Sequence, residues 1–287
     1  MIKTIIIAIA YVILAPVIGC LLSGFDRVLT ARMQGRKGPS VLQPLFDVKK
    51  LCSKEQLVVN NLQGVLVMSH LVLVVLTGVM MYMGYNLLLI MFFSGTAAML
   101  LVLAGGCTDS PYSSLGTSRE LLQLMAAEPA ELLVAVGFYM ACGSFNCADI
   151  VKGDKMAIAL LPGIFLAFVL IITIKMRKSP FDLSTSHHAH QELVKGLTTE
   201  MSGNYLAITE IAEWYENVFL LSVVALFFIT AAGLSIVWGV LAALVIWFLE
   251  ILIDNTCARV SWQTTFKVAW GATLILGGLN LVVLCLK

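Results

Sequence analysis

Charged residues are scarce in this chain of 287 residues. Asp, Glu, Lys and Arg together make up 12% of it, whereas hydrophobic residues make up 60%. Soluble domains average about 25% charged and about 45–50% apolar residues. So little charge would not keep a soluble surface hydrated, and a net charge of +1 does not supply the basic surface that nucleic acid requires. The remaining class is a protein that crosses the lipid bilayer several times.

Motifs that hold a redox group or a nucleotide are also missing. The sequence has no P-loop, no Rossmann glycine pattern, no ferredoxin-type cysteine spacing and no CxxCH haem site. Cys142 and Cys147 are five residues apart, but no second pair or histidine lies near them. The string HHAH at residues 187–190 lacks a nearby cysteine, so we favour a polar interface there over a metal site. We therefore predict no catalytic residue, no metal and no cofactor in this chain itself.

Long apolar runs of about 20 residues, enough to cross the hydrocarbon layer as a helix, occur eight times. An open sheet edge cannot cross lipid, so we predict an all-α fold with eight transmembrane helices. The predicted spans are residues 4–24, 62–83, 86–106, 120–142, 155–176, 207–231, 233–253 and 267–286. No internal repeat is present, which predicts a single domain over residues 1–287. Residues 40–60 alternate apolar and basic residues, typical of an amphipathic interfacial helix or of a solvated loop helix.

The distribution of basic residues predicts the orientation. Fourteen of the 18 lysines and arginines lie in or beside the loops 24–61, 107–119, 177–206 and 254–267. The remaining four are Lys3, Lys152, Lys155 and Lys287. By the positive-inside rule, the long basic loops face the cytoplasm and both termini lie outside. The protein is thus expected to be a multi-pass protein of the cytoplasmic membrane, with its functional surface on the cytoplasmic loops.

Carboxylates inside the predicted spans are the most informative residues, because each costs about 2.5–3.5 kcal/mol to insert. One span carries Glu128 and Glu131, and another begins with Glu210, Glu213 and Glu216, whose spacing places them in one row on a helix. Acids in one row repel one another when all are ionised, so some of them would hold protons. A series of carboxylates that share protons is what a proton path requires.

Further acids lie nearer to the ends of the spans. Glu120, Glu216 and Asp254 are as readily explained by solvation at headgroup depth as by a role in such a path, and Glu250 precedes Asp254 by one helical turn. Arg119 adjoins Glu120 and could neutralise it. The basic residues available as counter-charges are Arg119, Arg177, Lys178, Lys195 and Arg259.

Short motifs in the cytoplasmic loops resemble a known family. Arg36-Lys37-Gly38-Pro39, followed by Leu42-Gln43-Pro44 and Lys54-Glu55, is similar to the RRKGPN, LQP and KE pattern of the NuoH family, the membrane subunit at the heel of respiratory complex I. Residues 178–183 resemble the RAPFDL of that family. Further similar motifs are Glu192-Leu193-Val194, Thr199-Glu200-Met201-Ser202-Gly203 and Ala212-Glu213-Trp214.

Departures from the usual pattern resemble the hydrogenase branch of this family. The stretch from Ser184 to Gly196 contains HHAHQE, similar to the HxAHQE of energy-converting [NiFe] hydrogenases. The segments EIAEWYE (210–216) and DNTCAR (254–259) are also hydrogenase-like, and the Arg- and Pro-rich stretch of complex I is missing after residue 254. Within this branch, the sequence is most similar to the NuoH-like membrane subunit of the Ech-type hydrogenases, EchB.

The resemblance implies a non-catalytic subunit of a ferredoxin-dependent, H2-evolving hydrogenase. Expected partners are a small subunit with a [4Fe-4S] cluster, a [NiFe] large subunit, a ferredoxin-like subunit and an antiporter-like membrane subunit, in a lipid bilayer and without nucleic acid. The docking and coupling loops would include Arg36, Lys37, Arg119, Asp182, His190, Glu192, Glu200 and Asp254. The proton relay would use Glu128, Glu131, Glu210, Glu213, Glu216 and Glu250.

Other functions stay open on the sequence alone. A quinone-site heel subunit of complex I and the equivalent formate hydrogenlyase subunit share the same motifs. A stand-alone secondary transporter would carry inverted repeats and broken helices, neither of which is seen. A purely structural anchor would leave the acids inside the spans unexplained. The sequence does not distinguish H+ from Na+ as the coupling ion, nor the direction of the reaction.

Overall fold

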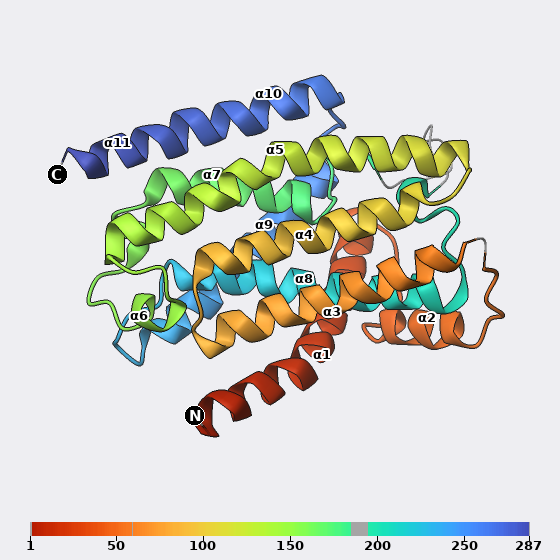
Figure 1. Ribbon diagram of the computed structural model, residues 1–287, viewed down its shortest axis with the longest axis horizontal. Helices are drawn as coiled ribbons and strands as arrows, with labels where there is room; N and C mark the ends of the chain where they lie inside the picture. The colour runs from red at the N-terminus through yellow and green to blue at the C-terminus, as the bar shows by residue number, and fades with distance from the viewer. Residues whose placement is uncertain (1, 59, 185–194, 287) are drawn as a thin grey trace.

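The computed structural model describes residues 2–58, 60–184 and 195–286, which form a bundle of long helices (Figure 1). The long helices are α1 (Ile2–Met33), α3 (Asn61–Met83), α4 (Leu87–Gly106), α5 (Pro111–Cys142), α7 (Pro162–Lys175), α8 (Gly203–Leu226) and α9 (Ser235–Thr256). The last helix is continuous through α10 (Trp262–Ala272), the π-helical segment η3 (Thr273–Gly278) and α11 (Leu279–Cys285). Short elements are α2 (Gln43–Cys52), α6 (Cys147–Ile150), η1 (Ala157–Ala159) and η2 (Gly196–Thr198).

The prediction of an all-α protein that crosses the membrane repeatedly is confirmed. Six helices are long and apolar enough to span a bilayer: α1, α3, α4, α5, α9 and the helix from α10 to α11. The other two predicted spans correspond to α7, which has only 14 residues, and to α8, whose three glutamates lower its hydropathy. The count of eight crossings and the side on which the termini lie stay predictions.

Several predicted boundaries were wrong. The span predicted at 155–176 begins at Pro162, because Pro has no N–H to lose in the first turn and fixes the start of a helix. The span at 207–231 is the helix Gly203–Leu226. Helix α1 continues past residue 24 to Met33, and α5 begins at Pro111 rather than at residue 120. These two helices extend well beyond the apolar run that hydropathy detects.

Local signals explain the tight hairpin between α3 and α4. Gly84 ends α3 in the left-handed conformation (φ 83°), which a residue with a side chain rarely adopts. The Asn86 side chain then accepts hydrogen bonds from the N–H groups of Leu88 and Leu89 and caps α4. The two helices therefore pack antiparallel along their whole length (Figure 1).

The core lies where α5, α7 and the end of α8 meet. Phe138 of α5, Phe168 of α7 and Phe227 are fully buried, and the rings of Phe138 and Phe227 are 4.6 Å apart. The helix from α10 to α11 packs on the outside of α5 and α7 (Figure 1). Its Asn280 side chain accepts hydrogen bonds from the N–H groups of Gly163 and Ile164, and so caps α7 from another helix.

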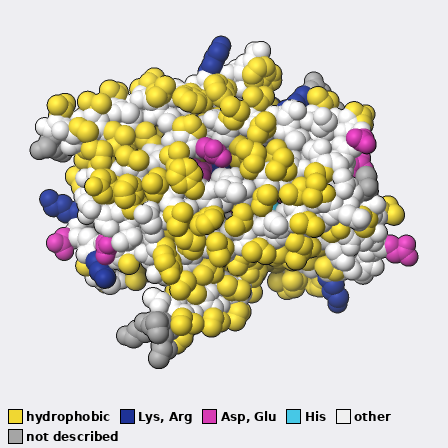
Figure 2. Space-filling model, in the orientation of Figure 1, with side chains coloured by type: hydrophobic (Ala, Val, Ile, Leu, Met, Phe, Trp, Pro, Cys, Tyr) yellow, Lys and Arg dark blue, Asp and Glu magenta, His cyan; other side chains and the backbone are white. Residues whose placement is uncertain are grey.

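The outer surface is hydrophobic, as Figure 2 shows for one face. Ile236, Val237, Trp238, Val240 and Leu241 of α9, for example, are all exposed by about half. A belt of this kind is stable only against lipid, so the chain is a multi-pass membrane protein of the cell membrane. Within the predicted interfacial segment 40–60, α2 packs against α1 and α8.

Candidate functional site

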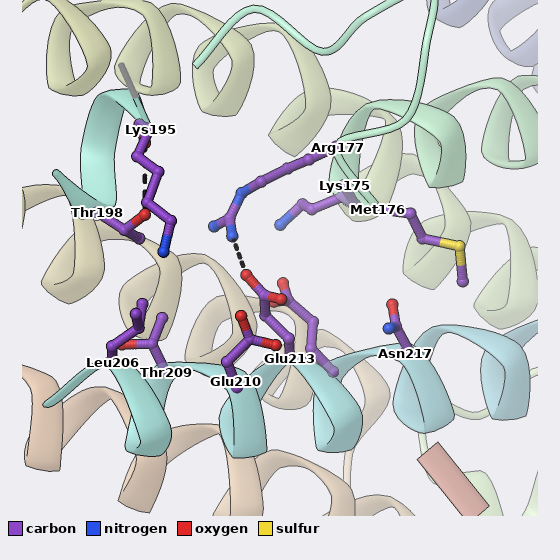
Figure 3. Close-up of a pocket in the computed structure, with 11 residues that line it drawn as sticks. Lys175, Met176, Arg177, Lys195, Thr198, Leu206, Thr209, Glu210, Glu213 and Asn217 are labelled. Carbon is purple, nitrogen blue, oxygen red and sulfur yellow. Dashed lines mark hydrogen bonds and ion pairs between the residues drawn. The ribbon is translucent and has the colours of Figure 1, made fainter. Parts of the chain in front are cut away.

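The centre of the molecule holds a network of buried charges at the end of α7. This helix ends at Lys175, and Arg177 follows in the left-handed conformation with φ 51°. Figure 3 shows the side chains of Lys175 and Arg177 pointing from this end of α7 toward Glu213 on α8. Two basic side chains thus enter the bundle where α5, α7 and α8 face one another.

Arg177 bridges two helices. Its Nε donates to Glu120 Oε1 of α5 at 2.9 Å, and its Nη1 donates to Glu213 Oε1 of α8 at 2.8 Å. Only 12% of the Arg177 side chain is exposed. The planar guanidinium suits this role, because it offers several N–H donors in fixed directions. Glu120 is therefore paired with Arg177, whereas its sequence neighbour Arg119 donates to the Leu183 carbonyl oxygen at 3.5 Å.

Lys175 forms a second, deeper ion pair. Its Nζ lies 2.8 Å from Glu131 Oε1 of α5, and the two side chains are only 4% and 3% exposed. An uncompensated charge at this depth would be strongly unfavourable, so each member needs the other.

A cavity of about 100 Å³ opens beside these ion pairs. Glu210, Glu213 and Glu216 line one wall of it, as expected for one row on α8, and Lys175 and Arg177 line the opposite wall (Figure 3). We call this space the inner cavity. The rest of its lining is Met176, Lys195, Thr198, Leu206, Thr209 and Asn217.

A second cavity, of about 230 Å³, lies between α4 and α5. Glu128 and Glu131 line it, and the rest of its lining is Met91, Phe92, Gly95, Thr96, Met99 and Leu132. We call this space the lateral cavity. A Cβ atom on Gly95 would lie 2.7 Å from Glu128 Oε1, so the missing side chain makes room for that carboxylate. Figure 2 shows an acidic patch inside the hydrophobic surface over α5.

Glu250 is placed apart from this network. It is fully buried on α9 and lines neither cavity. Neither of its carboxylate oxygens has a hydrogen-bond partner within the described part of the chain, although Thr173, Lys178 and Asp254 are its polar neighbours. The structure therefore gives Glu250 no contact with the other five predicted relay acids.

The predicted docking loops are tied to the bundle by ion pairs. Asp182 pairs with Arg259, which follows α9, and Asp254 Oδ1 accepts a hydrogen bond from the Ser179 N–H at 2.8 Å. Lys178 pairs with Asp26 of α1 at 2.8 Å. Residues 177–184, which we call the coupling segment, are thus fastened to α1 and to the end of α9.

Other predicted docking residues lie further out. Arg36 and Lys37 are exposed in the loop after α1, and Glu200 is half-buried between η2 and α8. His190 and Glu192 lie outside the described residues. No three side chains in the described ranges converge in a way that would hold a metal ion.

Two buried basic groups escaped the sequence reasoning. Lys175 was counted only as a loop-edge residue, because nothing in the sequence shows that its side chain turns inward. His70 of α3 is 1% exposed, with Nδ1 2.7 Å from the Ala97 carbonyl oxygen, and its charged neighbours are Glu216, Arg177 and Glu120. A lone histidine within an apolar span was the available signal for it.

The fold and the site define a class: an integral membrane protein that keeps ion-paired acids and bases inside its bundle. The family model for NADH dehydrogenase matches residues 4–285, so the chain belongs to the NADH dehydrogenase family. The resemblance to NuoH is thereby confirmed.

Named relatives include subunits of two kinds of complex. The NuoH subunit of the NADH-quinone oxidoreductase of Magnetococcus marinus is 27% identical, over 90% of this chain and 84% of that protein. The corresponding NuoH subunit of Methylococcus capsulatus is 33% identical over 69% of this chain and 65% of that protein. Hydrogenase-4 component C of Escherichia coli is 28% identical over 93% of this chain and 91% of its own length.

A solved structure has the same fold. A chain of the membrane-bound sulfane sulfur reductase, an archaeal respiratory membrane complex, matches with a TM-score of 0.87 and 19% identity. The match covers 98% of this chain and 99% of that one.

Proposed function

We propose that this chain is the membrane-anchor and proton-relay subunit of a ferredoxin-dependent, H2-evolving energy-converting [NiFe] hydrogenase. It docks the hydrogenase module on its cytoplasmic loops and couples the redox reaction there to translocation of H+ or Na+. The [NiFe] site and the [4Fe-4S] clusters are carried by partner subunits.

One observation carries the relay role. Ionisable side chains form a series from the inner cavity, through the Lys175–Glu131 ion pair, to the lateral cavity with Glu128. Buried charges of this kind are unfavourable in a membrane and mark ion pathways. A structural anchor would have no use for them.

The hydrogenase branch is supported by the sequence. The HHAHQE string at residues 187–192 and the similarity to hydrogenase-4 component C favour it over the complex I branch. The antiporter-like subunit, the small and large hydrogenase subunits and the ferredoxin-like subunit are the partners that this branch requires.

The geometry suggests how a redox event would reach the relay. The coupling segment begins at Arg177, which holds Glu213 at 2.8 Å. A movement of this segment on reduction of the docked module would take the guanidinium away from Glu213 and favour protonation of that carboxylate. A change of two units in one pKa corresponds to about 2.7 kcal/mol. That exceeds the roughly 2.3 kcal/mol needed to move one charge across 100 mV.

Purification of the complex in mild detergent tests the proposed function. We expect partner subunits that contain nickel, with H2 production from reduced viologen, and proton translocation after reconstitution into vesicles. Glu131→Gln and Glu213→Gln should each abolish translocation, while Asp154→Asn, an exposed acid that lines neither cavity, should have no effect. Full coupled translocation in both glutamine variants would refute the relay.

A quinone-site subunit of complex I is the second candidate, favoured by the NADH-quinone oxidoreductase relatives. It predicts co-purification with NADH-oxidising subunits, no nickel, and inhibition by quinone-site ligands. Recovery of the chain without partners, together with ion transport, would instead favour a secondary transporter.

A further inference from the structure

We propose that the Lys175–Glu131 ion pair is the proton-transfer gate between the inner and the lateral cavity, with Lys175 as the group that gives up and regains the proton. This inference rests on the proposed proton relay, and it names the step on which the relay depends.

The position of the pair carries the inference. Lys175 lines the inner cavity together with Glu216, whereas its partner Glu131 lines the lateral cavity together with Glu128. The 2.8 Å contact between Nζ and Oε1 therefore joins the walls of two separate spaces. A third space of about 10 Å³, close to the least that a single water molecule occupies, is lined by Lys175, Glu216 and Glu120. Lys175 thus faces Glu216 on one side and Glu131 on the other.

The depth of the pair argues against a purely structural role. Both side chains are almost fully buried, and their atoms contact α5 and α7, which already pack through the apolar core around Phe138 and Phe168. Apolar side chains of similar size would hold the two helices together as well as a buried ion pair does. What an ion pair adds is a proton that can be exchanged.

The transfer balances in two steps. An N–H bond of the Lys175 ammonium breaks and an O–H bond forms on the Glu131 carboxylate, which leaves both groups neutral. The neutral amine then takes the proton of a protonated Glu216, which restores the ammonium and leaves a Glu216 carboxylate. The net result is one proton moved from the inner to the lateral cavity, where Glu128 is the next acceptor.

Lys175→Arg is the decisive variant. Arginine keeps the positive charge and the contact with Glu131, but it does not lose its proton in proteins. We expect proton translocation by the reconstituted complex, followed with an internal pH-sensitive dye and a sodium ionophore present, to fall by about a hundredfold, the range of one proton-transfer group. Viologen-linked H2 production and the recovery of all subunits should stay at the wild-type level. Lys267→Arg on α10, whose side chain lines neither cavity, is the matched control and should translocate normally.

The outcomes separate the gate from the proposed function. A wild-type complex that makes H2 without translocating protons overturns both. A wild-type complex that translocates, with Lys175→Arg at the same rate, overturns the gate alone. If Lys175→Arg fails to assemble, the double variant Lys175→Gln/Glu131→Gln removes both charges at once and leaves neither unpaired. In that variant, lost translocation supports the gate and full translocation overturns it.

Discussion

One guanidinium connects three segments at the centre of the molecule. Arg177 pairs with Glu120 of α5 and Glu213 of α8 while it begins the coupling segment. Its pair with Glu120 is well buried, and breaking a buried ion pair by removing one partner typically costs about 3–5 kcal/mol. Arg177 therefore has a structural role as well as its proposed role in coupling, which is why the proposed tests change the acids rather than this arginine.

Gly116 of α5 allows a second close approach near the same site. A Cβ atom there would lie 2.6 Å from the carbonyl carbon of Gly196, in the turn η2 that carries Thr198 to the inner cavity. Backbone cannot move aside as a flexible side chain does, so Gly116→Ala should lower stability by about 1–3 kcal/mol. Thermal unfolding of the detergent-solubilised complex measures this. Gly271→Ala, where no atom lies within 4 Å, is the control, and equal melting of both variants would contradict the prediction.

At the scale of elements, α2 is attached to α1 by a polar contact. Arg27 of α1 pairs with Asp47 of α2 at 2.5 Å, and Gln43 Nε2 donates to the same carboxylate at 3.0 Å. Partial burial alone would raise the pKa of Asp47. The hydrogen bonds from Arg27 and Gln43, together with the positive charge of Arg27, outweigh burial and lower that pKa below its ordinary value of 3.8.

The sign of this shift predicts how α2 responds to pH. A carboxyl whose pKa is lowered in the folded state stabilises the fold above its ordinary pKa, and that contribution is lost as the pH falls through the lower, folded value. We expect α2 to stay attached from pH 7 down to about pH 4 and to loosen at lower pH. A nitroxide on Cys52, with the other exposed cysteines replaced by serine, reports this as increased mobility. The same label in Asp47→Asn should be equally mobile at pH 7 and pH 3, and a pH response there would contradict the assignment.

The ends of the elements show what the sequence could and could not predict. Residues 62–83 and 86–106 are uninterrupted apolar runs bounded by Gly84 and Asn86, and the observed helices differ from them by one residue. The start of α5 was missed by nine residues because its first turns are polar, and hydropathy reports lipid contact rather than helix. The row of acids on α8 followed from their spacing, whereas the Lys175–Glu131 pair joins residues 44 positions apart, and no local pattern predicts it.

At the scale of the whole molecule, the bundle has two different ends. In Figure 1, α6 and the end of α11 lie at the left, whereas α2 lies at the right. The basic loops belong to the end that contains α2, so the positive-inside rule makes this end cytoplasmic.

Cysteine labelling tests this orientation directly. Cys52 after α2 and Cys257 after α9 are exposed, whereas Cys20 and Cys147 are buried. A membrane-impermeant maleimide should label Cys52 and Cys257 in inverted vesicles and leave them unlabelled in right-side-out vesicles. Asp154→Cys, in the exposed turn before α7, should show the opposite behaviour. Labelling of Cys257 from the outside would reverse the orientation.

The cap that Asn280 provides to α7 has a consequence for the order in which the protein is built. Its side-chain oxygen accepts from the N–H of Gly163 at 2.8 Å, and its amide nitrogen donates to the Leu160 carbonyl at 2.9 Å. Those backbone groups have no other cap from the sequence around them, since Leu161 precedes the helix. The first turn of α7 is therefore completed only when the last helix has been synthesised and inserted. Lys175, at the other end of that short helix, reaches its final place late, so a nascent chain has no finished proton gate.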